Sequence, residues 1–353
     1  MSDTEAGETV ALPPPVGLRL ARALGLLFPL VLVMMALTLG VGAQPIGFGD
    51  IWHSLRKVGW GLFAAPETGW TSDDIILWTL RGPRVIAAAL VGFILGSAGA
   101  SLQGLFRNPL ADPYLIGVSA GAAIGWAAGL LFGFDQWAGG LGMAGVGFLT
   151  GLVSLALVYR LSKVGGRVAM ESLILAGVVV GSLMWSGLVL TMTLLRPTDL
   201  REVFFFLLGN FTAARWDMVA MLAGVTAPGF LALWSLGHPL NLMALGDEAA
   251  EALGLDLARA QRRVLLWAAV LTAAAVAVSG VIGFVGLITP HLARRFVGAD
   301  HRVLLPVAGG VGAILLVWAD ALARRQDDVF PVGVLTAVLG APFFLYVLRR
   351  TRR

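Results

Sequence analysis

The sequence has no cysteine and only two lysines among its 353 residues. Without cysteine, the chain can form no disulfide and can offer no thiolate to a metal ion or an iron–sulfur cluster. The four histidines lie outside the apolar runs or at their ends and lack ligand spacing, so we predict no metal site. Neither Lys57 nor Lys163 follows the glycine of a G-x-x-x-x-G-K-[ST] loop. We therefore predict that the chain is not an enzyme and that any nucleotide hydrolysis occurs on another polypeptide.

Charged residues are also scarce, at 13% of the chain, whereas 58% of the residues are apolar and the mean hydropathy is +0.85. Roughly 20 helical residues cross a bilayer core about 30 Å thick, and apolar runs of that order recur from Leu24 to Leu348. The composition predicts an all-α integral membrane protein with ten transmembrane helices. The predicted spans are approximately residues 23–43, 84–104, 115–134, 138–160, 171–195, 216–236, 263–280, 281–295, 303–323 and 333–349.

The basic residues indicate how these spans are oriented. An even number of spans places both termini on one side, and 16 of the 25 basic residues then fall on that side. This excess predicts cytoplasmic N- and C-termini in the inner membrane of a bacterium. Residues 1–17 are polar and proline-rich and are predicted to be a disordered cytoplasmic segment, followed by one transmembrane domain over residues 18–353. The dispersed basic residues form no recognisable nucleic-acid-binding module, so no nucleic-acid partner is expected.

Glycine is abundant, with 46 residues. In lipid, helices associate through small residues that let their backbones approach closely. Several glycines recur four residues apart, which predicts helix packing rather than substrate contact for nearly all of them. They are Gly92 and Gly96, Gly117, Gly121 and Gly125, and Gly177 and Gly181.

A polar segment at about residues 240–258 interrupts the apolar runs with the sequence LNLMALGDEAAEALG. Gly246 and Gly254 bracket a helix-prone stretch, and Asp247 and Glu248 fall in its first turn, where the helix dipole favours carboxylates. The pattern predicts a short helix on the cytoplasmic face. From these residues alone, the helix is either a docking surface for another protein or an ordinary interfacial amphipathic helix.

A tight cytoplasmic hairpin is predicted where Arg107-Asn108-Pro109 ends one span and Asp112-Pro113 begins the next, with Asp112 capping the new helix. A similar pattern recurs 188 residues later and hints at an internal duplication. Arg295, Ala299, Asp300 and Gly309 correspond to Arg107, Ala111, Asp112 and Gly121.

Six stretches in series resemble the permease subunits of the ATP-binding-cassette (ABC) importers for iron–siderophore, haem and cobalamin. They are RGPR, LQGLFRNPLADPYLIGVSAGAAIG, GDEAAEALGL, SGVIGFVGLITPHLARRFVGADHRVLLP, ADALAR and PVGVLTAVLGAPFF, and they span about residues 78 to 350. The resemblance implies a ten-helix permease domain of the type II importer class, paired as a homodimer. It also implies two cytoplasmic ATPase subunits and an external substrate-binding protein. ATP and magnesium would bind the ATPases, so we expect no cofactor on this chain.

The resemblance also suggests roles for two groups of residues. The EAA-x3-G signature of the family rests on the ATPase, which implies ATPase coupling through Gly246, Asp247, Glu248, Ala249, Ala250 and Gly254. In the family, the arginines of the RGPR and ADALAR motifs pair with acidic residues of the binding protein, which implies docking by Arg81, Arg84 and Arg324. The alternative is that Arg81 and Arg84 mark a membrane edge while Arg324 pairs with Asp320, one turn earlier.

The translocation path is expected along residues 171–216, where hydroxyl groups interrupt an apolar span. The candidates are Ser182, Ser186, Thr191 and Thr193, followed by a short external helix within residues 196–210. Such hydroxyls also bond backbone carbonyls within membrane helices, so lining of the path is one of two interpretations.

Three functions are consistent with the sequence. The first is ATP-driven import of a metal chelate by alternating access, with a ferric siderophore or haem favoured over cobalamin. An ion-gradient-driven secondary transporter is the second, and it would need an ionisable group in the membrane, for which Asp320 is the best candidate. The third is a non-transporting membrane scaffold that recruits ATPases through the same short helix.

Overall fold

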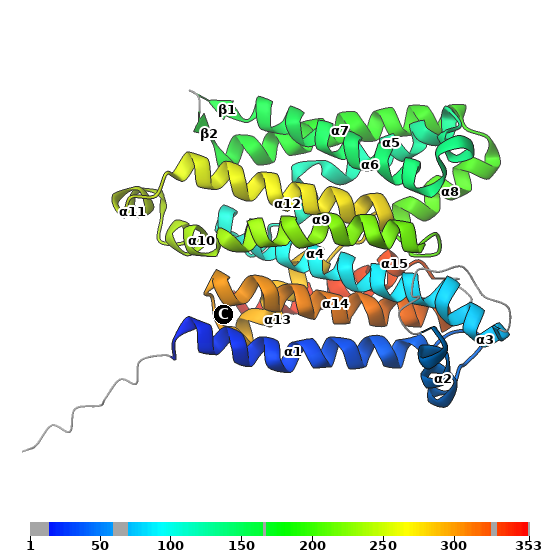
Figure 1. The fold of residues 1–353 in the computed structure, drawn as a ribbon. Helices are drawn as coiled ribbons and strands as arrows, with labels where there is room; N and C mark the ends of the chain where they lie inside the picture. The colour runs from blue at the N-terminus through cyan, green and yellow to red at the C-terminus, as the bar shows by residue number, and fades with distance from the viewer. Residues whose placement is uncertain (1–13, 59–69, 165–166, 326–329, 352–353) are drawn as a thin grey trace, which may run out of the picture.

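The computed structural model describes residues 14–58, 70–164, 167–325 and 330–351. In Figure 1 the long helices run roughly side by side in one bundle. The long helices are α1 (Val16–Leu39), α4 (Gly82–Phe106), α5 (Val118–Leu131), α6 (Phe134–Leu161), α7 (Met170–Leu194), α9 (Trp216–Ser235), α12 (Leu257–Ser279), α13 (Val285–Val297), α14 (His301–Arg325) and α15 (Val332–Thr351).

Shorter elements connect the long helices. The short helices are α2 (Phe48–Val58), α3 (Ser72–Ile75), η1 (Ile76–Arg81), η2 (Pro113–Ile116), α8 (Pro197–Leu208), α10 (Gly237–Met243) and α11 (Asp247–Ala252). A two-residue antiparallel ribbon pairs β1 (Lys163–Val164) with β2 (Arg167–Val168). The α10 and α11 helices and this ribbon lie at one end of the bundle, the α11 end, and α2, α3 and α8 lie at the other, the α8 end (Figure 1).

The predicted all-α membrane fold is confirmed. Seven helices in the described residues are long and apolar enough to span a membrane, and Val118–Leu131 and Val332–Leu345 are shorter apolar helices. Each of the ten predicted spans coincides with a long helix, although α13 has only 13 residues. The number of crossings, ten, stays a prediction. The start of α1 and the end of α15 both lie at the α11 end, as expected for termini on one side (Figure 1).

Several predicted helix boundaries are wrong. The first helix begins at Val16, inside the predicted disordered segment, of which residues 1–13 lie outside the described residues. The second begins near Ser72 rather than at residue 84, because Thr71 and Asp74 form a capping box ahead of α3 and α3, η1 and α4 follow without a break. The α13 helix starts later than predicted, because Gly280 and Phe284 have positive φ angles of 68°.

Glycine determines how closely the central helices approach. A Cβ on Gly92 of α4 would overlap the backbone of Gly312 in α14, and a Cβ on Gly312 would overlap that of Gly92. Gly96 and Gly177 likewise pack against backbone carbonyls, which confirms the packing role predicted for them. Gly181 differs, because a Cβ there would meet no heavy atom within 4 Å.

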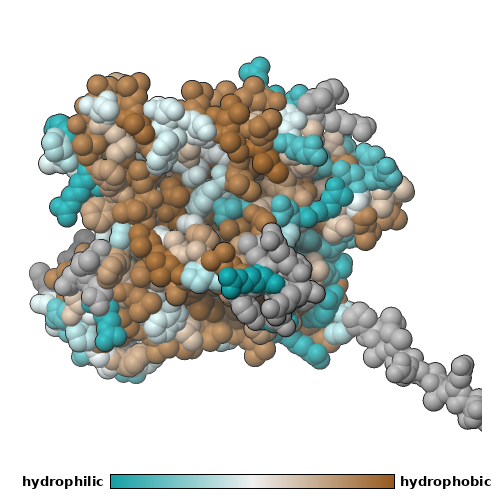
Figure 2. All heavy atoms as spheres, turned by 180° about the vertical axis from the view of Figure 1, so that it is seen from behind, coloured by the Kyte–Doolittle hydropathy of each residue, from teal (hydrophilic) through white to brown (hydrophobic). Residues whose placement is uncertain are grey.

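Apolar side chains cover most of the face shown in Figure 2, and strongly hydrophilic ones lie mostly toward its two ends. Single helices show the same pattern. Leu26 of α1 is 78% exposed and Leu183 of α7 is 64% exposed. Large apolar side chains exposed along membrane-spanning helices face lipid or another protein.

Candidate functional site

The predicted helix of the polar segment is α11, at the α11 end of the bundle (Figure 1). It is six residues long, with Asp247 and Glu248 in its first turn. Gly246 precedes it with φ 109° and Gly254 follows it with φ 84°. Both conformations are easily adopted by glycine and strained for other residues. The helix and its bracketing glycines therefore agree with the sequence prediction.

The exposed surface of α11 is narrower than the sequence suggested. Ala250 is completely buried, so it anchors the helix to the bundle and offers no surface to a partner. Ala249, Ala252 and Leu253 are exposed, and Leu253 is 61% accessible. A partner at this end would meet a small apolar surface bordered by the carboxylates of Glu248 and Glu251.

An ion pair links α11 to the end of α4. Arg107, the C-cap of α4 with φ 49°, lies 3.1 Å from a carboxylate oxygen of Asp247. Both side chains are nearly half exposed, so the pair itself contributes little to stability, about 0–1 kcal/mol.

The predicted hairpin after α4 is confirmed, since the Asp112 side chain accepts a 2.8 Å hydrogen bond from the backbone N–H of Tyr114.

A second network lies close to α11 and was not predicted. Asn241 of α10 donates a 2.7 Å hydrogen bond to Asp300, and Arg19 of α1 and Arg302 of α14 each pair with Asp300 at 3.0 Å. Although partial burial works in the opposite direction, the hydrogen bonds from Arg302 and Asn241 lower the pKa of Asp300 to about 2. Asp300 is therefore ionised near neutral pH and joins three elements beside the polar segment. The sequence repeat pointed to Asp300 but not to these partners.

At the α8 end, the arginines predicted to dock a binding protein are buried. The Asp320 side chain is fully buried between two of them, 2.6 Å from Arg84 Nε and 3.0 Å from Arg324 Nε. Arg84 and Arg324 are only 7% and 6% exposed. The pairing of Arg324 with Asp320 agrees with the structural alternative raised from the sequence.

Arg81 is also held internally. Its guanidinium donates a 2.8 Å hydrogen bond to the carbonyl of Leu39 and a further one to the carbonyl of Gln44, and it is 6% exposed. Arg324 donates a 3.0 Å hydrogen bond to the carbonyl of Thr38. The arginines thus tie the ends of α1, α4 and α14 together. Docking of a partner by these side chains stays a prediction.

The hydroxyl candidates for the translocation path lie on α7. Ser182 and Ser186 line a surface groove of about 430 Å³ between α7, η2 and the start of α5. The Ser186 hydroxyl donates a 2.9 Å hydrogen bond to the Ser182 carbonyl. Thr191 and Thr193 do not line this groove, and they donate to the carbonyls of Gly187 and Leu190. Bonding of backbone carbonyls, the second interpretation, is therefore seen for three of the four.

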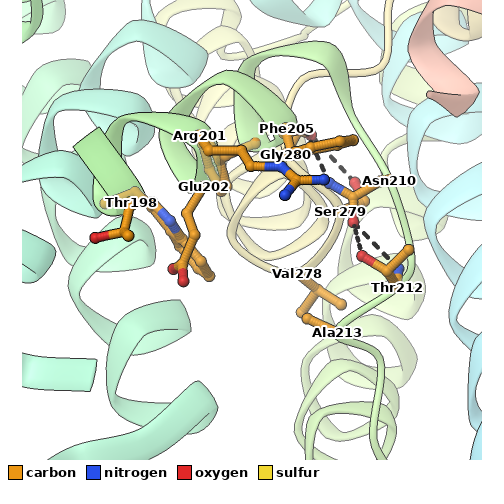
Figure 3. Close-up of a pocket in the computed structure, with 12 residues that line it drawn as sticks. Thr198, Arg201, Glu202, Phe205, Asn210, Thr212, Ala213, Val278, Ser279 and Gly280 are labelled. Carbon is orange, nitrogen blue, oxygen red and sulfur yellow. Dashed lines mark hydrogen bonds between the residues drawn. The ribbon is translucent and has the colours of Figure 1, made fainter. Parts of the chain in front are cut away.

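The described part of the chain also contains a polar pocket of about 690 Å³ at the α8 end. Figure 3 shows Arg201 and Glu202 of α8 beside the loop that carries Asn210 and Thr212 and the end of α12 at Ser279. At the rim, the loop is bonded to the end of α12, because the backbone N–H of Asn210 donates a 2.9 Å hydrogen bond to the Ser279 carbonyl. The sequence predicted α8 but not this pocket.

Aromatic side chains form part of the pocket wall. The Trp126 ring lines the pocket and stacks on the Phe206 ring, with 4.6 Å between the two ring centroids. The indole nitrogen is buried without a hydrogen-bond partner among the described residues. Arg201 lies 5.6 Å from the Phe205 ring centroid, within the range of a cation–π contact. Among the residues placed in the structure, no three His, Cys, Asp or Glu side chains are grouped to hold a metal ion.

A bundle of long apolar helices with a short exposed helix at one end defines a multi-pass membrane protein. The chain belongs to the FecCD transport family, whose family model matches residues 30–350.

Relatives of known name agree with this assignment. The chain is 37% identical to the cobalamin import system permease protein BtuC of Halobacterium salinarum, over 96% of this chain and 90% of that protein. It is 36% identical to the hemin transport system permease protein HmuU of Yersinia pestis, over 93% of this chain and 96% of that protein. A solved structure described as an inward-facing metal-chelate type ABC transporter matches with a TM-score of 0.78 and 32% identity, over 93% of this chain and 98% of that chain.

The predicted family and function are thereby confirmed. The chain is a permease subunit of an ABC importer, and ATP hydrolysis takes place on separate ATPase subunits. It is a multi-pass membrane protein whose family works with an ATPase and a binding protein.

Proposed function

We propose that two copies of this chain form a permease that moves an organic metal chelate into the cytoplasm by alternating access. In this proposal the α11 end faces the cytoplasm and two ATPases, and the α8 end faces an external binding protein. The observation that carries the proposal is the glycine-bracketed α11 helix, exposed at the end of the bundle where α1 begins and α15 ends. The excess of basic residues at that end supports a cytoplasmic location.

Coupling to the ATPase is assigned to the exposed surface of α11. Ala249 is exposed, and it lies beside the buried Ala250 that fixes the helix to the bundle. A long charged side chain at Ala249 would obstruct close packing against a partner without disturbing the core. The Arg107–Asp247 pair and the Asn241–Asp300 hydrogen bond connect this surface to α4 and α14. A force applied to α11 would reach the long helices by that route.

The coupling proposal is tested with Ala249→Arg and a matched control, Ser72→Arg, which adds the same charge to an exposed position at the α8 end. We expect Ala249→Arg to lose co-purification of the ATPase and to lower ATP-driven uptake at least ten-fold, while Ser72→Arg behaves like the wild type. Equal uptake by both variants, with the ATPase retained, would refute the assignment of α11.

The cargo is proposed from the relatives and from the polar pocket. The relatives named above import cobalamin and hemin, which are both bulky metal chelates of organic ligands. The pocket at the α8 end offers the N–H donors of Arg201 and the carboxylate of Glu202 beside aromatic walls. These groups suit a chelate that carries carbonyl or carboxylate groups on an apolar frame. A ferric siderophore or haem remains our first expectation, followed by cobalamin.

Cargo and energy source are tested together in proteoliposomes that contain the permease, its ATPase and its binding protein. Uptake of haemin, a ferric siderophore and cobalamin is compared with and without internal or external ATP and with an ionophore. Uptake that needs ATP and survives the ionophore supports the proposal. Uptake abolished by the ionophore alone would favour the ion-gradient transporter, and ATPase recruitment without any flux would favour the scaffold.

The buried arginines are given a positioning role in this proposal. Arg84 and Arg324 enclose Asp320, and Arg81 holds the chain that follows α1. The family resemblance supports docking of a binding protein at this end, and the internal bonds support a function in which the arginines fix the docking surface. Exchange of Arg81, Arg84 and Arg324 for glutamate should weaken binding-protein affinity and uptake, and unchanged values would exclude both roles.

A further inference from the structure

A groove at the α11 end has no role in the proposed function. It lies between α1, α13 and α14 and has a volume of about 600 Å³. Its walls are apolar along most of its length and include Leu26, Leu30 and Phe296. Arg19 and Arg22, near the start of α1, also line it, so it combines an apolar trough with a basic end.

The apolar part of the groove opens toward the lipid. Leu26 and Phe296 are 78% and 80% exposed, and Thr38 is the single buried residue among the described residues of α1. The α1 helix has 24 residues, and an 18-residue stretch within it has a mean hydropathy of 2.2, so it is a membrane span with one side uncovered. A trough along such a helix is accessible to an acyl chain without any opening of the bundle.

The basic end of the groove has unused hydrogen-bond donors. Arg19 pairs with Asp300 through Nη2 at 3.0 Å, whereas its Nε is buried and has no partner among the residues that the structure describes. Arg22 is exposed, and no hydrogen bond or ion pair to it is present within the described ranges. The groove residues include no carboxylate. This end therefore fits a negatively charged group with several acceptor oxygens.

We infer that the groove binds an anionic phospholipid, with an acyl chain against Leu26, Leu30 and Phe296 and the phosphate at the exposed guanidinium of Arg22, beside the partly exposed guanidinium of Arg19. Basic side chains between membrane helices, at the depth of the head groups, attract anionic lipids. The lipid phosphate would lie beside Arg19, whose guanidinium keeps its bond to Asp300 through Nη2.

The site has a consequence for the neighbouring network. Arg19 is bonded to Asp300, and Asp300 is bonded to Asn241, which lies at the start of the polar segment. A phosphate bound at Arg19 would hold α1 in place against α14 at the point where the network meets α10. Anionic lipid is thus expected to stabilise the α11 end specifically. This inference needs only the membrane position of the chain and does not depend on the coupling role of α11.

The experiment uses the full-length permease in nanodiscs of phosphatidylcholine with increasing fractions of phosphatidylglycerol. Native mass spectrometry counts the phosphatidylglycerol retained after release from the disc, and thermal unfolding is followed in the same samples. We expect the wild type to retain phosphatidylglycerol and to unfold at a higher temperature as its fraction rises. Arg22→Gln should reduce retention at least five-fold and should remove the thermal shift.

Two further variants make the result specific. Arg262→Gln removes the same charge from an exposed position of α12 at the same end but outside the groove, and it should behave like the wild type. Leu30→Trp should fill the apolar trough and reduce retention while both arginines remain. Equal retention in Arg22→Gln and Arg262→Gln would overturn the inference. Cross-linking of two copies through Leu26→Cys would also overturn it, because a second copy of the chain would then occupy the groove.

Discussion

At the scale of single residues, we expect the buried carboxylate of Asp320 to be important for the stability of the α8 end. It is fully buried between the guanidinium groups of Arg84 and Arg324. Asp320→Asn would leave these two cations buried without a carboxylate. Removal of one member of a buried ion pair destabilises proteins by about 3–5 kcal/mol. We expect a loss of this order in denaturant unfolding of the purified permease.

The control for this prediction is Asp217→Asn. Asp217 pairs with Arg215 at 2.8 Å, but the two side chains are 32% and 64% exposed. Exposed pairs contribute about 0–1 kcal/mol, so this variant should unfold close to the wild type. If Asp320→Asn proved equally mild, Asp320 would not be the structural centre of the cluster, and its role in an ion-driven mechanism would need to be reconsidered.

The same cluster shows what residue spacing can predict. The pair Arg324–Asp320 was available from the sequence, because residues four apart on a helix lie on one face. The pair Arg84–Asp320 joins α4 to α14 across 236 residues of sequence, and no local pattern specifies it. The network of Arg19, Asn241 and Asp300 is likewise made of distant partners. Polar side chains were therefore predictable as candidates, but their burial and pairing required the packed helices.

At the scale of elements, α4 and α14 make a close backbone contact through glycine. Gly312→Ala would place a methyl group against the backbone carbonyl of Gly92, where neither helix can yield without shifting. Overpacking of this kind destabilises by about 1–3 kcal/mol. Gly181→Ala is the matched control, because no heavy atom lies within 4 Å of the added Cβ. Alanine favours a helix over glycine, so this variant should be as stable as the wild type or more so.

Thermal unfolding in detergent distinguishes the two glycine variants. A lower midpoint for Gly312→Ala and an unchanged or higher one for Gly181→Ala are expected. A midpoint for Gly312→Ala equal to that of the wild type would mean that α4 and α14 are not in close contact in the membrane. Gly92, on which Gly312 packs, and Gly181 both belong to the i, i+4 glycine pairs of the sequence. The structure separates Gly92, which packs against a neighbouring backbone, from Gly181, which lies at a groove.

The long helices themselves were well predicted because each apolar run is long enough to form one. The errors lie where local backbone chemistry overrides hydrophobicity. The capping box at Thr71 starts a helix well before its apolar part, and positive φ angles at Gly280 and Phe284 delay the start of α13. The exposed surface of α11 was also difficult to predict, since its exposed and buried positions are both occupied by alanine. Which of them contacts the bundle is decided by tertiary packing alone.

At the scale of the whole molecule, the proposed dimer requires one face of the bundle to be covered by a second copy. The α7 helix exposes large apolar side chains beside the groove that contains Ser182 and Ser186. A second copy that covers this face would enclose the groove on the axis between two subunits and convert it into a path. In contrast, the equally apolar α1 is a lipid-facing helix in the proposed arrangement.

The absence of cysteine makes this arrangement directly testable, because a single introduced thiol has no competitor in the chain. Leu183 of α7 and Phe28 of α1 are matched, at 64% and 65% exposed. With a short bis-maleimide in native membranes, Leu183→Cys should yield a covalent dimer and Phe28→Cys should stay monomeric. Dimers from Phe28→Cys alone would place the subunit contact at α1 and leave α7 facing lipid. In that case Ser182 and Ser186 would lie outside the path, since the groove they line would open into the bilayer.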